Sequence, residues 1–123
     1  MSELTIISKL KSLTNSRFLL LTQSGDYAIM LAIEAVKNLI PNTYNLTPIT
    51  YNLKPIFLIP DQSGWLSYQK YPKKLGFEII EVKTDYGIID LEDLKEKSKT
   101  ASGFIYQNPA GYFAEQPSKE IYE

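Results

Sequence analysis

The chain has 123 residues, of which 44% are hydrophobic and 22% charged, which is the composition of one ordinary globular domain. Thirteen basic side chains nearly balance fourteen acidic ones, and the net charge of −1 provides no basic surface for nucleic acid. The sequence has no histidine and no cysteine, which excludes zinc fingers, Ser-His-Asp triads and thiol redox sites. We therefore expect a single domain over residues 1–123, without a metal site or a nucleic-acid partner.

Hydrophobic periodicity divides the first part of the chain into three elements. Apolar residues at helical spacing over 4–13 predict an amphipathic helix. The apolar run 17–22 predicts a strand buried on both faces, and a broad apolar stripe over 29–40 predicts the helix after it. Residues 41–55, which contain prolines and a Tyr-Asn-Leu repeat, are interpreted as a loop excursion of unknown role.

The second part of the chain alternates more regularly. Its predicted strands cover 56–59, 77–82 and 103–106, and its predicted helices cover 65–75, 91–98 and 118–123. Gly76 suits a helix C-cap and Asp90 suits an N-cap. Four strands that alternate with helices predict an α/β fold, a three-layer αβα arrangement with a mostly parallel sheet of about four strands and right-handed βαβ crossovers.

No segment of the sequence predicts a membrane partner. The apolar runs are far shorter than the roughly twenty residues of a membrane span. Residues 1–4 also lack the basic start and apolar core of a signal peptide. We therefore expect a soluble, cytoplasmic protein.

Candidate binding residues follow the predicted strands, where parallel sheets bind their ligands. Ser24 and Gly25 lie at a strand-to-helix turn, which can either present backbone amides to a phosphate or simply cap a helix. Trp65, the only tryptophan, can stack on a planar ligand or fill a core or oligomer contact. Asn108 begins an Asn-Pro-Ala-Gly segment that would equally form an ordinary turn.

Taken in order, these segments resemble the front part of the large domain of fold-type I pyridoxal-phosphate enzymes, the aminotransferase superfamily. The resemblance covers about residues 17–123 and rests on four stretches: Ser24-Gly25-x-x-Ala28, Ile59–Tyr68, Lys74–Leu94 and Gln107-Asn108-Pro109-Ala110-Gly111. It implies that Ser24 and Gly25 bind the cofactor phosphate, that Trp65 stacks on the pyridine ring and that Asn108 bonds the 3-oxygen. It also implies a homodimer, because these enzymes build their sites across a dimer interface.

Two functional groups of that family have no counterpart in the sequence. Its members place a pyridine-binding aspartate and a Schiff-base lysine after the Asn-Pro-x-Gly segment, and none of the twelve lysines here matches that lysine's position. The resemblance therefore describes a truncated half of the large domain, with no catalytic residue to nominate. We expect any pyridoxal 5'-phosphate to bind non-covalently, and no activity from this chain alone.

Three functional hypotheses follow. In the first, the chain is a non-catalytic ligand-binding or protein-interaction module. In the second, it is one half of a split aminotransferase or decarboxylase, whose lysine and aspartate come from a separately encoded complementary subunit. In the third, it is a small α/β protein with no cofactor role, and replacing Trp65 or Asn108 would alter stability only.

Overall fold

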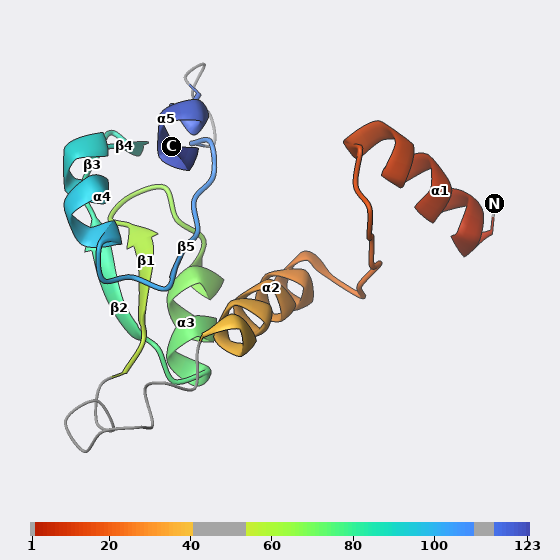
Figure 1. Cartoon of the computed structure of the whole chain (residues 1–123), viewed down its shortest axis with the longest axis horizontal. Coiled ribbons are helices and arrows are strands. Elements are labelled where there is room, and N and C mark those ends of the chain that lie inside the picture. Colours follow the sequence, from red (N-terminus) through yellow and green to blue (C-terminus); the bar gives the residue numbers. More distant parts are fainter. Residues whose placement is uncertain (1, 41–53, 110–114) are drawn as a thin grey trace.

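The structure is a computed structural model that describes residues 2–40, 54–109 and 115–123. Within these residues the chain forms five helices and five strands (Figure 1), in the order α1 (Glu3–Thr14), α2 (Gly25–Leu39), β1 (Ile56–Pro60), α3 (Leu66–Lys74), β2 (Glu78–Val82), β3 (Thr84–Asp85), β4 (Ile88–Ile89), α4 (Leu91–Ser98), β5 (Gly103–Phe104) and α5 (Ser118–Tyr122). The Tyr-Asn-Leu repeat and the end of the Asn-Pro-Ala-Gly segment lie outside the described residues.

The main sheet has three parallel strands in the order β2-β1-β5. β1 pairs with β2 along its whole length, from Ile56 opposite Glu78 onward, whereas it pairs with β5 only at Phe57 and Leu58. Because β2 and β5 are both parallel to β1, helices must carry the chain back between them. The predicted α/β fold with a mostly parallel sheet is confirmed, with three strands instead of about four.

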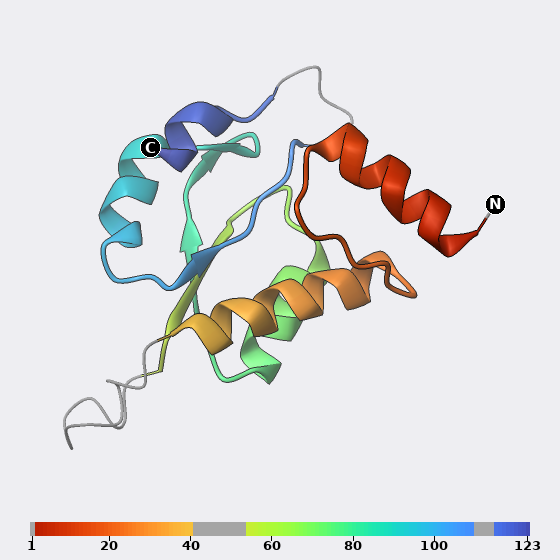
Figure 2. The same ribbon diagram turned by 45° about the vertical axis from the view of Figure 1, so that its right-hand side comes forward.

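Helices cover both faces of this sheet, because successive side chains of β1 point to opposite sides. Phe57 and Ile59 pack in one core cluster with Ile33 of α2 and with α3. Leu58 packs in a second cluster with Val82 of β2 and with α4. Figure 2 shows the result, with α2 and α3 on one side of the sheet and α4 and α5 on the other.

The strand predicted over residues 17–22 is wrong. This segment forms no strand, and Phe18 and Leu20 are 83% and 77% exposed. A strand needs a hydrogen-bonding neighbour, and in the described residues the main sheet consists of β2, β1 and β5, with no ladder to residues 17–22. The run is apolar enough for a buried strand, but it connects two helices outside the sheet.

α1 stands apart from the layered body, as Figures 1 and 2 both show. The predicted helix is confirmed, with Ser2 as its N-cap and Asn15 in the left-handed conformation at its end. None of its residues is buried, however, and Leu4 and Leu13 are about four-fifths exposed. In the part of the chain that the structure describes, no helix is long and apolar enough to cross a bilayer.

The predicted helix ends are confirmed at both Gly76 and Asp90. Gly76 has a φ of +92°, and its N–H and that of Phe77 donate to the carbonyls of Lys73 and Pro72, which closes α3 in a Schellman motif. Asp90 caps α4 by accepting from the N–H of Asp93 at 3.1 Å. These local signals were readable because each depends on one residue type at one position.

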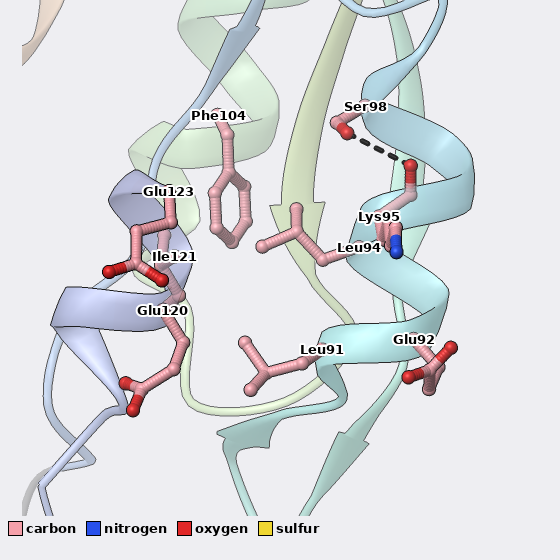
Figure 3. A pocket seen from close by; sticks show the side chains of 9 residues that line it. All are labelled: Leu91, Glu92, Leu94, Lys95, Ser98, Phe104, Glu120, Ile121 and Glu123. Atoms are coloured by element: carbon pink, nitrogen blue, oxygen red, sulfur yellow. Dashed lines mark hydrogen bonds between the residues drawn. The ribbon is translucent and has the colours of Figure 1, made fainter.

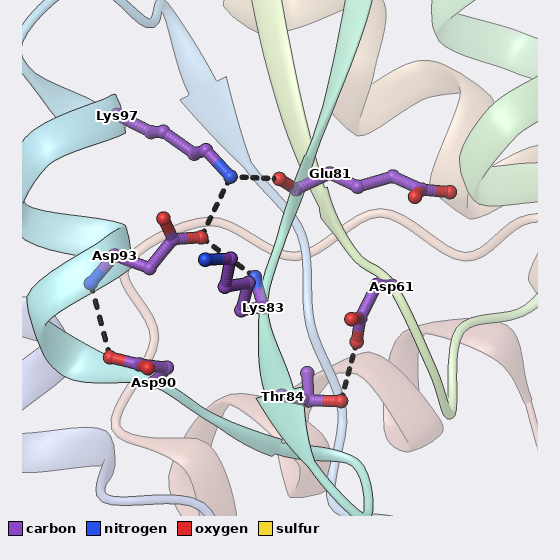
Figure 4. Close-up of polar contacts among 7 residues, drawn as sticks. All are labelled: Asp61, Glu81, Lys83, Thr84, Asp90, Asp93 and Lys97. Atoms are coloured by element: carbon purple, nitrogen blue, oxygen red, sulfur yellow. Dashed lines mark hydrogen bonds and ion pairs between the residues drawn. The ribbon is translucent and has the colours of Figure 1, made fainter.

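A polar network joins α4 to β2 (Figure 4). The Asp93 carboxylate accepts from the Lys83 N–H and from the Lys97 ammonium, both at 2.8 Å, and Lys97 also donates to the Glu81 carbonyl. The hydrogen bond from the Lys83 N–H, and after it the hydrogen bond from Lys97, holds the pKa of Asp93 below its ordinary value. The network fixes α4 against the edge strand of the sheet.

Candidate functional site

A cavity of about 390 Å³ lies where α2 and α3 begin, beyond the carboxyl ends of β1 and β5. Open parallel sheets bind ligands at this position because the loops and helix N-termini converge there. The residues that line it come from three separate segments: Ser24, Gly25, Asp26, Ile29, Trp65, Tyr68 and Gln107. Three of the four residues nominated from the sequence, Ser24, Gly25 and Trp65, therefore lie together.

Ser24 and Gly25 form the start of α2. The Ser24 hydroxyl caps the helix by accepting from the Tyr27 N–H at 3.1 Å. Gly25 is the first helical residue, and a Cβ atom at this position would meet nothing within 4 Å. The open space beside Gly25 means that a ligand can approach the backbone of the first turn closely.

Trp65 lies at the N-cap of α3 and presents its ring to the cavity. The side chain is 58% exposed, and its indole N–H donates to Asp26 Oδ1 at 3.1 Å. Among the described residues, the close aromatic pairs are Phe57 with Phe77 and Phe104 with Tyr106, so no neighbouring ring covers the indole. The hydrogen bond to Asp26 holds the indole while leaving ring surface for stacking.

α3 lacks the side-chain cap that α2 has. No side chain accepts from its first amides, and its first turn holds no acidic residue. Helix N-terminal N–H groups without partners carry partial positive charge and attract anions. The start of α3, next to the Trp65 ring, is therefore the less obstructed of the two helix N-termini at the cavity.

Tyr68 and Gln107 close the inner side of the cavity. The Tyr68 hydroxyl donates to Gln107 Oε1 at 3.0 Å, and this bond joins α3 to the segment that follows β5. Burial raises the pKa of the Tyr68 hydroxyl above its ordinary value, so the group stays protonated near neutral pH. Tyr68 follows Trp65 by one helical turn, a spacing that would have placed both on one face of α3.

Asn108, the fourth nominated residue, does not line this cavity. Its side-chain Oδ1 accepts from the backbone N–H of Gln116 at 2.9 Å. The Gln116 side chain in turn donates to the carbonyls of Gly87 and Gln107 and accepts from the Ile89 N–H. The Asn108 side chain is therefore engaged with Gln116, and Gln107 is the residue of that segment that lines the cavity.

Asp26 is the only charged side chain among the residues that line the cavity, and it was not nominated from the sequence. Lys70 lies close by, in a neighbouring hollow of about 580 Å³ that shares Asp26 and Trp65. The described residues include no group of three or more acidic side chains that could hold a metal ion. The cavity thus combines an aromatic ring, helix amides and amide or hydroxyl groups, which are binding groups more than reactive ones.

The fold and the cavity define a class: an α/β domain with a parallel sheet and a ligand-sized cavity at its carboxyl edge. No family model matches the sequence, and no curated protein or solved structure shows significant similarity to the chain.

Proposed function

We propose that this chain is a non-catalytic ligand-binding domain, and that the cavity between α2 and α3 takes a small planar phosphorylated molecule such as pyridoxal 5'-phosphate. The observation that carries the proposal is the convergence of Ser24, Gly25 and Trp65. Ser24 and Gly25 lie about forty positions before Trp65 in the sequence. The resemblance to pyridoxal-phosphate enzymes nominated all three residues for the same ligand.

The cavity residues fit such a ligand in two respects and oppose it in one. The uncovered Trp65 ring suits a flat heterocycle, and the open space at Gly25 lets a phosphate approach the first backbone amides of α2. The Asp26 carboxylate opposes a phosphate by charge repulsion, although its bond to the Trp65 indole N–H turns one oxygen toward the ring. We therefore propose binding of modest affinity.

Binding without catalysis is the form of the proposal that the cavity residues favour. Lysine is absent from the side chains that line the cavity, and the protonated Tyr68 hydroxyl is a donor and not a base. A bound pyridoxal phosphate would supply an electron sink, but the lining residues include no amine that could form the imine such chemistry uses, and their one carboxylate, Asp26, is bonded to the Trp65 indole N–H. Lys70 is the lysine with which this reasoning can be tested, because it lines the neighbouring hollow.

Removing the Trp65 ring is expected to weaken pyridoxal 5'-phosphate binding about fivefold, since aromatic stacking contributes about 1 kcal/mol. The measurement is equilibrium dialysis of wild type and Trp65→Ala, with ligand followed by its own absorbance so that loss of indole fluorescence does not matter. Tyr122→Ala is the matched control, because it removes an aromatic ring that is 85% exposed on α5, outside the cavity.

Three results would contradict the proposal: no saturable binding at millimolar ligand, equal binding by Trp65→Ala and wild type, or an equal loss in Tyr122→Ala. Borohydride reduction of the complex followed by peptide mapping separates binding from imine formation. Scattered labelling of surface lysines agrees with non-covalent binding in the cavity. Stoichiometric labelling of Lys70 alone would overturn the non-catalytic part of the proposal.

Neutralising Asp26 is expected to tighten binding of the same ligand by about threefold to tenfold at low salt, because one like charge beside the phosphate is removed. Asp26→Asn keeps a side-chain oxygen that can accept from the Trp65 indole N–H. The difference in affinity between Asp26→Asn and wild type should shrink as the salt concentration is raised from low to physiological. Asp85→Asn, an exposed carboxylate on β3, is the control and should bind like wild type. Weaker binding by Asp26→Asn would mean that the cavity prefers a cationic ligand.

A further inference from the structure

An apolar groove lies between α4 and α5, on the sheet face opposite to the candidate site. It encloses about 460 Å³ and its apolar lining comes from Leu91, Leu94, Phe104 and Ile121. Figure 3 shows Leu91 and Leu94 pointing from α4 toward α5, with Phe104 between the two helices. Apolar side chains that line such a hollow gain stability when a second apolar surface covers them.

The charges at the groove are mostly negative. Glu120 and Glu123 flank it on α5, and Lys95 is the only basic residue of its lining. A partner that fits the groove therefore needs an apolar stripe bordered by positive charge.

α1 is a helix with that pattern. At 100° per residue its apolar side chains Leu4, Ile6, Ile7, Leu10 and Leu13 form one broad stripe, with Lys9 beside one border, Lys11 near the other border between Ile7 and Leu4, and Glu3 within the stripe. No residue of α1 is buried, and Leu4 and Leu13 are strongly exposed while Ile7 and Leu10 are half-buried, so most of this stripe is open to a partner. The groove is open above the buried Leu94, and its mostly acidic charges complement the two lysines of α1.

We propose that α1 of one copy docks in the α4–α5 groove of a second copy, and that the exchange is reciprocal. The twelve residues of α1 give a rod of about 18 Å, and the segment 15–24 that tethers it can span up to about 33 Å. The tether leaves from α2, which covers the other face of the sheet, so the arm extends away from its own groove (Figure 2). A twofold axis lets each copy give one arm and receive one.

The docked arm also accounts for the apolar residues next to it. Phe18 and Leu20 are exposed in the tether, and a strand over residues 17–22 was expected from their composition. Between two copies these side chains lie against protein surface instead of water.

The first experiment measures mass by sedimentation equilibrium from 1 to 200 μM, the full chain being used throughout. Wild type is expected to be a dimer, and Leu10→Glu, which places a carboxylate in the middle of the stripe, is expected to be a monomer over this range. Ser12→Glu adds the same charge on the opposite face of α1 and is expected to remain a dimer. A monomeric wild type, a dimeric Leu10→Glu or larger open assemblies would overturn the proposal.

The second experiment uses the absence of cysteine in the sequence. Leu10→Cys and Leu91→Cys proteins are mixed and oxidised, and a disulfide between α1 and the groove joins two chains into one species of doubled mass. The chain carrying both substitutions distinguishes exchange from folding back. Its reciprocal disulfides should give a covalent dimer, whereas a disulfide-closed monomer would show that each arm occupies its own groove and would overturn the proposal.

Discussion

Replacing Gln116 by leucine is expected to lower the free energy of unfolding by about 3 kcal/mol, because each buried polar group left without a partner costs about 1–3 kcal/mol. Gln116 is 6% exposed, and its side chain bonds three backbone groups: the Ile89 N–H at 2.9 Å, the Gly87 carbonyl at 2.7 Å and the Gln107 carbonyl at 2.9 Å. Leucine has a similar volume and satisfies none of them. The loss therefore comes from hydrogen bonding and not from a cavity.

Urea unfolding of wild type and variant, followed by circular dichroism, measures this difference. Gln69→Leu is the matched control, because Gln69 is an exposed residue of α3 with the same side chain, and it should change stability by less than about 0.5 kcal/mol. A loss below about 1 kcal/mol in Gln116→Leu would show that water or other groups satisfy the three backbone partners.

Gln116 also illustrates what the sequence could not reveal. Nothing in the surrounding residues distinguishes it from a surface glutamine, because two of its three partners lie 27 and 29 positions earlier, on β4 and on the turn before it, and the third lies nine positions earlier. The elements that were predicted correctly depend on local patterns instead. The apolar run of β1, the Gly76 end of α3 and the Asp90 cap of α4 can each be read from a few neighbouring residues.

The strand predicted at residues 17–22 was wrong although the local pattern was clear. Its apolar composition was read correctly, but composition does not say which surface will bury a segment.

The residues of the candidate site were also predicted only in part from local sequence. The position of Trp65 followed from the rule that ligands bind beyond the ends of parallel strands. Ser24 was nominated as the residue after a strand over 17–22 that does not form, and it lines the cavity because it caps α2. The choice of Gln107 over its neighbour Asn108 depended on a long-range bond to Gln116.

Substituting alanine at Gly87 is expected to cost about 2–4 kcal/mol, of which about 1–2 is backbone strain and the remainder is crowding. Gly87 and Tyr86 both have positive φ in the two-residue turn between β3 and β4, the geometry of a type I′ turn. A Cβ atom at Gly87 would collide with the Ser63 side chain and lie 3.2 Å from Pro109. Gly76→Ala separates the two contributions, since Gly76 has nearly the same φ of +92° but nothing within 4 Å of the added Cβ. It should cost only about 1–2 kcal/mol.

A double variant tests whether Ser63 is the source of the crowding at Gly87. Ser63→Gly removes both the hydroxyl and the Cβ that would be struck, and it relieves the positive φ of 62° at Ser63 itself. In a double-mutant cycle by urea unfolding, Ser63→Gly is expected to recover about 1–2 kcal/mol of the loss in Gly87→Ala. Additive effects would mean that strain at the turn, and not contact with Ser63, sets the cost.

Because Ser63 precedes Trp65 by two residues, coupling between Gly87 and Ser63 would also shift the fluorescence of Trp65 in Gly87→Ala but not in Gly76→Ala. The hairpin would then be a support for the ring that the proposed ligand contacts.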